Sequence, residues 1–494
     1  MMPERRPTWT PTASDYGQVL DEQNPWHFTG EVPEAWALPV ERPLARYLWR
    51  RLQSNTPRRF QLILGPRRVG KTTSLYQTAS SLIMAGVPSS RVWWLRLDHP
   101  LLMEFDLGDW VRSLLTGSNA TIEEPLFLFL DELTYAKRWD LWLKTFYDET
   151  WPVVITGSSS STAALREMRT ESGVGRWEEQ YLAPYLFGEY LDLFESPSWT
   201  DAGGTLAETI ENIAAARPHI PNLARLRRRF LLTGGFPELL IAAKNSNDDE
   251  ASLLLESQRT LRSDAVERAI YKDIPQAFGI ENPMMMERLL YTLAGQIGGI
   301  LSTATISRTL ASMSAPTLER YSAYLERAFL IFTLPNYSGA EAARQRRGKK
   351  LYFVDGAVRN AALQRGLAPL NNSEEMGALI ENLAASHLHA LGQHSQVRIY
   401  HWRHQNHEVD LIYDHPDLPL AFEIGSSATH NRRGLQRFIE EFPRFRGRCY
   451  VVAPEVTTRK AGDAQDGIGT IGLDYFLLAV SAQAESELRR RLGA

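Results

Sequence analysis

The sequence of 494 residues contains a single cysteine and no long apolar run. With only Cys449 present, an internal disulfide framework and a cysteine-rich zinc site are both excluded. The first residues, MMPERRPTWTPTASDYGQ, lack the apolar core of a signal peptide, and no stretch approaches the ~20 apolar residues that span a bilayer. We therefore expect a soluble, cytoplasmic protein with no membrane contact.

A strong net charge is also lacking. The formal net charge is -4, so no global basic field attracts nucleic acid, and such binding would have to use local patches. A hydrophobic content of 44% supplies enough apolar surface for packed cores, which argues against a mainly disordered chain. The length exceeds that of one compact core and predicts two or three domains.

Apolar runs alternate with helical patterns in the first part of the chain. Residues 1–40 are rich in Pro and Trp without a sustained period, which predicts an irregular arm. An amphipathic helix is expected next, with Leu44, Leu48 and Leu52 on its apolar face. Buried strands are predicted at residues 60–65, 92–98, 126–132 and 152–158. Crossovers of this length imply parallel βαβ units, so we predict an α/β domain with a parallel sheet over residues 41–195.

The next region, residues 196–340, is mostly helical in its periodicity. Within it, residues 305–310 and 316–328 predict two short helices joined by a turn and followed by a strand. This is the outline of a winged helix-turn-helix, a pattern found in many DNA-binding proteins.

The last region, residues 341–494, opens with the charged segment EAARQRRGKK, which is expected to be exposed. An apolar strand at 351–355 follows it. Beyond this strand the sequence predicts a helix at 376–391, several strands and an Arg-rich helix, again an α/β composition.

The segment GPRRVGKTT matches G-x-x-x-x-G-K-[ST] between a predicted strand and a predicted helix, the context of a P-loop. Its glycines let backbone N–H groups and the helix N-terminus face phosphates. Lys71 is expected to reach the β- and γ-phosphates, and Thr72 to give its hydroxyl to Mg²⁺. The predicted contributors to binding of ATP are Gly65, Pro66, Arg67, Arg68, Val69, Gly70, Lys71, Thr72 and Thr73.

The run LFLFLDE places two acidic residues at the end of a buried strand. Asp131 is predicted to hold Mg²⁺ through water. Glu132 is predicted to orient or deprotonate the attacking water, which would make the protein a hydrolase and not a passive nucleotide binder. A surface Asp-Glu pair is the alternative.

Two further side chains are predicted to complete the catalytic site. Ser158, at the end of the next strand, is expected to contact the γ-phosphate or the water; the alternatives are Thr156, Ser159 and Ser160. Arg176 is a candidate arginine finger that would stabilise transition-state charge in a neighbouring subunit of a homo-oligomer. An ordinary exposed arginine is the other interpretation.

Taken in order, these segments resemble those of a known family, the prokaryotic AAA+-like ATPases with a C-terminal restriction-endonuclease-like domain. The resemblance runs from about residue 45 to the end, through segments that include GPRRVGKTT, LFLFLDEL, VVITGSSS, LTGGFPELL, ERAIYKDI, KKLYFVDGAVRNAAL and GALIENLAASHL. It implies an ATPase domain, a winged-helix middle and an α/β restriction-endonuclease-like domain at 341–494.

Nucleases of that fold place a helix Glu, a strand Asp and a Glu-x-Lys around a divalent metal. The resemblance assigns these carboxylates to Glu381, Asp410 and Glu423, a candidate second metal site, whereas the lysine position is Gly425. The alternative is that the three carboxylates have only a structural role. Without that positive charge we expect cleavage to be weak or absent. A metal-dependent DNA nuclease is therefore the least favoured function.

Three basic clusters, at residues 225–229, 344–350 and 432–448, are candidates for contact with DNA phosphates, with solvated faces as the alternative. Two functions of different classes remain open. The protein is either an ATPase that acts on or with DNA, or a switch in which ATP controls an interaction with a protein partner.

Overall fold

The structure, a computed structural model, shows two compact units. They comprise Met1–Leu64, Lys71–Gln180 and Leu492–Ala494 in the first, and Gly65–Gly70 and Tyr181–Arg491 in the second. The structure describes residues 11–54, 59–160, 175–194, 202–216, 220–245, 249–280, 282–310, 313–338, 348–425, 432–454 and 456–493.

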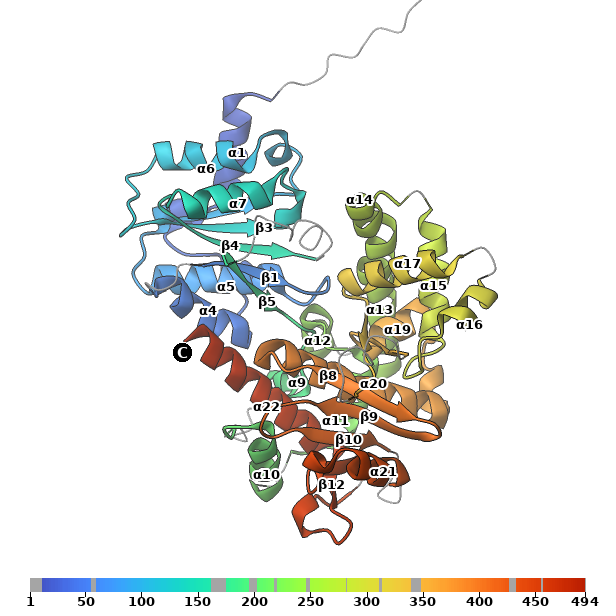
Figure 1. Cartoon of the computed structure of the whole chain (residues 1–494). Helices are drawn as coiled ribbons and strands as arrows, with labels where there is room; N and C mark the ends of the chain where they lie inside the picture. The colour runs from blue at the N-terminus through green and yellow to red at the C-terminus, as the bar shows by residue number, and fades with distance from the viewer. Residues whose placement is uncertain are drawn as a thin grey trace, which may run out of the picture. The chain divides into compact units, whose positions relative to one another are not determined.

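The first unit is an α/β domain. Its elements are α1 (Ala13–Gln23), α2 (Trp26–Thr29), α3 (Glu34–Ala37), α4 (Pro43–Gln53), β1 (Phe60–Leu64), α5 (Lys71–Met84), β2 (Val92–Arg96), α6 (Leu107–Thr116), β3 (Leu126–Asp131), α7 (Trp139–Asp148), β4 (Val153–Ser159) and β5 (Trp177–Tyr181). The strands form one sheet in the order β2-β3-β4-β1-β5. Helices α4 and α5 lie on one face of the sheet, and α6 and α7 on the other (Figure 1).

The four predicted strands and their parallel pairing are confirmed. Strands β1, β3 and β4 are buried along their whole length, as expected for strands covered by helices on both faces. Parallel pairing joins β2 to β3, β3 to β4, and β4 to β1. The predicted amphipathic helix is α4, whose Leu44, Leu48 and Leu52 are buried.

The N-terminal arm is not irregular in its described part. Helix α1 starts with a capping box in which Thr12 and Asp15 exchange hydrogen bonds. Beyond it, the side chain of Asn24 donates to Trp94 O and accepts from Trp94 N, at 3.0 and 2.6 Å. Trp26 Nε1 donates to Val92 O at 2.7 Å. The arm thereby satisfies backbone groups of β2, which is one of the two edge strands of the sheet.

The second unit contains the remaining elements. Its helical part comprises α9 (Phe187–Phe194), α10 (Leu206–Ala216), α11 (Leu223–Thr233), α12 (Pro237–Asn245), α13 (Glu250–Leu261), η4 (Arg262–Glu267), η5 (Ala269–Asp273), α14 (Ile274–Phe278), α15 (Pro283–Ala294), α16 (Thr303–Thr309) and α17 (Ala315–Arg327). Its α/β part comprises β6 (Ile331–Leu334), β7 (Lys350–Phe353), α19 (Gly356–Ala362), α20 (Ser373–Ser395), β8 (Ile399–His404), β9 (His407–Tyr413), β10 (Leu420–Ile424), α21 (Arg433–Glu441), β11 (Cys449–Ala453), β12 (Ile468–Gly472) and α22 (Leu473–Leu492).

A mixed sheet in the order β12-β11-β10-β9-β8 organises the end of the chain. Strands β10, β11 and β12 are parallel, whereas β9 is antiparallel to both β10 and β8. Residues of α20 and α22 form a core with one set of strand side chains, and residues of α21 form a second core with the other set. The domain is therefore a helix–sheet–helix sandwich, and Cys449 is buried within β11.

The predicted domain boundaries near residues 195 and 340 stay a prediction, and the compact units divide the chain at other positions. The main part of the first unit ends at Gln180, and the described residues between Tyr181 and Arg491 belong to the second unit. The reason is long-range packing, since Phe187 of α9, Ile210 of α10 and Phe230 of α11 share a core with α20 and α22. Helix periodicity alone does not reveal such contacts.

The predicted helix, turn, helix and strand near residue 320 are present as α16, α17 and β6. Strand β6 pairs antiparallel with β7. A winged-helix function for these elements stays a prediction. Among the helices that the structure describes, none combines the length and apolar character needed to cross a membrane.

Candidate functional site

The ends of three adjacent strands place the predicted acidic and hydroxyl residues together. Leu64, the last residue of β1, is in register with Ser159, and Leu130 is in register with Gly157. The carboxyl ends of β3 and β4 therefore lie at one edge of the sheet. In α/β proteins this edge is the usual place for ligand binding.

Asp131 is the centre of a hydrogen-bond network at this edge. Thr72 Oγ1 donates to Asp131 Oδ2 at 3.0 Å, and Ser158 Oγ donates to Asp131 Oδ1 at 2.5 Å. Glu132 N donates to Ser158 Oγ at 3.3 Å. The structure therefore brings together four predicted site residues, although Ser158 here serves the acidic pair. Its expected contact with phosphate or water stays a prediction.

The electrostatics of this network suit a cation. Asp131 is only 6% exposed, and burial together with the charge of Glu132 raises its pKa to about 6. Hydrogen bonds from Ser158 and Thr72 and the charge of Lys71 act in the opposite direction. A hydroxyl beside a buried carboxylate is the donor set that Mg²⁺ uses with phosphates. The residues present therefore fit Mg²⁺.

Glu132 is held by a residue that the sequence offered only as an alternative. Ser160 Oγ donates to Glu132 Oε1 at 2.8 Å, and Ser160 N donates to Oε2 at 3.4 Å. Glu132 has φ of 52°, a left-handed conformation that is uncommon outside glycine and concentrates at functional sites. Ser160 thus orients the candidate general base, whereas Ser159 bonds with Thr134 at 3.1 Å.

The phosphate loop has the backbone that its sequence requires. Gly70 has φ of 87°, which favours glycine, and a Cβ on Gly65 would lie 2.2 Å from Leu182 O. Pro66, Val69 and Lys71 are buried, and Thr73 is half-buried. The side chains of Arg67 and Arg68 form ion pairs with carboxylates of the second unit.

Arg176 is engaged within its own unit. Its Nε and Nη2 donate to Asp148 Oδ1 and Oδ2 at 2.7 and 2.8 Å, a bidentate pair. A role as an arginine finger stays a prediction, and it would require this pair to open.

The carboxylates assigned to the nuclease-like site converge on a lysine. Lys350 Nζ lies 2.8 Å from Glu381 Oε1, 2.7 Å from Asp410 Oδ1 and 2.6 Å from Glu408 Oε1. Lys350 is 2% exposed, which corrects its predicted exposure in the charged segment. Residues 341–347 of that segment lie outside the described residues. Sequence reasoning missed Lys350 and Glu408 because their contacts link β7, β9 and α20.

Glu423 lies on β10 beside this cluster. The backbone N–H of the next residue, Ile424, donates to Asp410 Oδ2 at 2.8 Å. Within the described residues, no group of three or more His, Cys, Asp or Glu side chains is arranged to hold a metal ion. Three carboxylates already share the ammonium group of Lys350, so the donor set does not fit a second metal as it stands.

Two of the basic clusters contain arginines with acidic partners. Arg227 Nη1 lies 2.6 Å from Asp474 Oδ2, and Arg432 Nη1 lies 2.9 Å from Asp466 Oδ2. Such pairs reduce the charge that these clusters present. DNA contact by these clusters stays a prediction.

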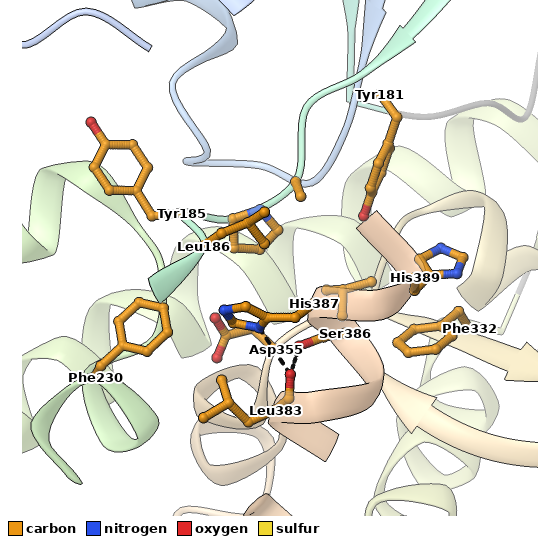
Figure 2. Close-up of a pocket in the computed structure, with 13 residues that line it drawn as sticks. Tyr181, Tyr185, Leu186, Phe230, Phe332, Asp355, Leu383, Ser386, His387 and His389 are labelled. Atoms are coloured by element: carbon orange, nitrogen blue, oxygen red, sulfur yellow. Dashed lines mark hydrogen bonds between the residues drawn. The ribbon is translucent and has the colours of Figure 1, made fainter. Parts of the chain in front are cut away.

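A small cavity of about 10 Å³ lies in the second unit, with His387 at its wall (Figure 2). This volume holds a single water and excludes a nucleotide. Phe187 N donates to His387 Nε2 at 2.8 Å, so Nδ1 carries the proton that Leu383 O accepts at 2.9 Å. Burial lowers the pKa of His387 to about 4. The histidine is thus a neutral core residue that joins α9 to α20.

Comparison with sequence families divides the chain into three parts. Residues 57–191 match an AAA domain. Residues 224–368 match the domain of unknown function DUF8612, and residues 376–469 match the domain of unknown function DUF4143. The chain therefore carries an AAA-type P-loop ATPase domain followed by two domains whose families have no assigned function.

The chain is also similar to curated proteins from an archaeon and a bacterium. It is 28% identical over 343 residues to the uncharacterized protein MJ1637 of Methanocaldococcus jannaschii, covering 68% of each chain. It is 23% identical over 404 residues to an uncharacterized protein of Haemophilus influenzae, covering 79% of this chain and 88% of the relative.

Among solved structures, a Walker-type ATPase of Pyrococcus abyssi aligns with a TM-score of 0.41 and 14% identity, covering 65% of this chain and 94% of that chain. The RuvB Holliday junction branch migration motor of Thermotoga maritima aligns with a TM-score of 0.25 and 16% identity, covering 68% of this chain and 94% of that chain. Scores this low do not support a shared overall arrangement.

Proposed function

We propose that this protein binds ATP with Mg²⁺ and hydrolyses it at the carboxyl ends of the parallel strands in the first sheet. The observation that carries the proposal is the network of Thr72, Asp131 and Ser158, which places a hydroxyl and a buried carboxylate next to Lys71 of the P-loop motif. The match of residues 57–191 to an AAA domain supports the same function.

Each residue of the network has a distinct role in the proposed reaction. Lys71 places its positive charge on the β- and γ-phosphates. Thr72 and Asp131 would hold Mg²⁺, and the ion would offset the charge that develops on the phosphates. Glu132 accepts a proton from the attacking water, and Ser160 keeps its carboxylate in one orientation. Ser158 donates to Asp131, which favours the ionised form that a cation needs.

For what hydrolysis drives, we propose action on or with DNA by a homo-oligomer. The helices α16 and α17 with the strands β6 and β7 support this proposal, because helix pairs followed by a hairpin are common in DNA-binding proteins. The alternative is a switch in which ATP controls docking of a protein partner on the C-terminal domain.

We propose that the C-terminal domain binds DNA or a protein partner and does not cleave DNA. The carboxylates of Glu381, Glu408 and Asp410 surround Lys350, so their charge is offset from within the protein. We expect no metal-dependent DNA cleavage from the purified protein. Mg²⁺- or Mn²⁺-dependent cutting of duplex DNA that disappears in Asp410→Ala would overturn this view.

Steady-state ATP turnover, measured with and without duplex and single-stranded DNA, separates the two functions. Action on DNA predicts stimulated turnover that declines steeply as salt rises, because contacts to phosphates release counterions. Two results together would favour the interaction switch. DNA would leave the rate of ATP turnover unchanged, and a partner protein would bind the Glu132→Gln variant only when that variant is loaded with ATP.

A further inference from the structure

Two arginines of the phosphate loop are tied to carboxylates of the helical region. Arg67 donates from Nε and Nη2 to Asp273 Oδ2 and Oδ1, both at 2.5 Å. These side chains are 15% and 9% exposed, so the pair is largely shielded from solvent. Arg68 donates to Glu238 and to Asp264. All five residues belong to the second unit.

Asp264 and Asp273 face the same loop because the helix between them is wider than an α-helix. Both lie in π-helical segments, Asp264 in η4 and Asp273 at the end of η5. In an α-helix with 3.6 residues per turn, the sequence separation of Asp264 and Asp273 corresponds to about two and a half turns, which would put their carboxylates on opposite faces. The wider π turn reduces it to roughly two turns. Segments of π-helix are rare in proteins, and those that occur are often found at functional sites.

The charges in this contact indicate a role in shaping the loop. Three carboxylates face two guanidinium groups, so the arginine charges are already compensated without a bound phosphate. Arg68 has φ of 67°, a left-handed conformation that costs a non-glycine residue energy and needs support from its surroundings. A guanidinium anchored on two carboxylates gives that support.

We propose that Asp273 is a positioning residue for ATP binding. Through its bidentate bond to Arg67 it holds the loop Gly65–Gly70 in the shape that accepts the phosphates, and Glu238 and Asp264 do the same through Arg68. All three acids lie within the DUF8612 match at 224–368, outside the AAA match at 57–191. The proposal rests on the proposed binding of ATP at this loop, and it makes the DUF8612 region a determinant of ATP affinity.

The test is the affinity of full-length Asp273→Asn for Mg²⁺-ATP, measured by titration calorimetry beside wild type. Losing a charge-assisted bidentate pair should raise the Kd roughly tenfold. The KM for ATP should rise equally, while kcat changes less than about twofold, because Asp273 touches no reacting atom. Asp273→Glu should recover most of the affinity. Arg67→Gln combined with Asp273→Asn should be no worse than either change alone.

Asp474→Asn is the matched control. It breaks the pair of Arg227 and Asp474, which is 14% and 15% exposed and 2.6 Å long, in the same unit. This variant should lose stability like Asp273→Asn but keep the wild-type Kd. An unchanged or tighter Kd in folded Asp273→Asn overturns the inference, as does an equal loss in Asp474→Asn. If wild type itself fails to bind Mg²⁺-ATP, the proposed function fails first and this inference falls with it.

Discussion

The Ser158 hydroxyl donates a hydrogen bond of 2.5 Å to Oδ1 of Asp131, and the two residues come from the ends of adjacent parallel strands. Asp131 is buried beside Glu132, an environment that raises its pKa to about 6. The bond from Ser158 opposes this shift because it favours the charged carboxylate. The serine thus helps to keep the proposed Mg²⁺ ligand ionised near neutral pH.

Replacing Ser158 by Ala should therefore move the acid limb of the pH profile. Turnover of wild type is expected to fall as pH drops through about 6, where Asp131 becomes protonated. In Ser158→Ala the pKa of Asp131 rises further, so this decline should begin at a higher pH. The measurement is kcat/KM for ATP from pH 5 to 8, with Ser159→Ala as the control on the same strand. Superimposable profiles for wild type and Ser158→Ala would contradict the assigned role.

The bond from Ser160 to Glu132 predicts an effect on kcat rather than on binding. Glu132→Gln should lower kcat at least about 100-fold, since a general base contributes on that order. Ser160→Ala should lower kcat about tenfold, because the carboxylate loses its orientation but not its basicity. Both variants should retain wild-type Kd for Mg²⁺-ATP. A Ser160→Ala enzyme with full kcat would remove Ser160 from the site.

Lys350 offsets three carboxylates in the core of the C-terminal domain, so its loss should be costly. Lys350→Met leaves Glu381, Glu408 and Asp410 without their shared counter-charge, and the free energy of unfolding should fall by roughly 3–5 kcal/mol. The neighbouring exposed lysine gives the control, since Lys349→Met should change stability little. Urea denaturation of both variants checks this, and equal stabilities would show that the cluster contributes nothing.

Buried His387 predicts how stability depends on pH. Burial lowers its folded pKa to about 4 from an ordinary 6.5, so between these values only the unfolded chain holds the proton. The contribution of neutral His387 to the free energy of unfolding is complete above pH 6.5. It is lost as pH falls towards 4, at about 1.4 kcal/mol per pH unit. The stability gap between wild type and His387→Gln should therefore narrow on acidification. A gap that is constant from pH 7.5 to 4.5 would contradict this.

Local patterns predicted the first sheet well because its central strands are continuous apolar runs. Strand β5 escaped prediction because WEEQY is polar and only partly buried. The capping box of α1, with Thr12 and Asp15, was a readable signal within the supposed irregular arm. The burial of Lys350 could not be predicted from the sequence, because a lysine in a basic run normally faces solvent. Its burial depends on contacts with α20 and β9. The acids that hold Arg67 and Arg68 depend equally on long-range packing.

The most direct test of the central claim is phosphate release from Mg²⁺-ATP by purified wild type and Lys71→Ala. Lys71 is expected to bring positive charge to the β- and γ-phosphates, so its removal should lower kcat/KM at least about 100-fold. Both proteins should show the same secondary structure by circular dichroism. Turnover by wild type that is abolished in Lys71→Ala is the predicted result, and turnover that is unchanged in Lys71→Ala would contradict an ATPase site at this loop.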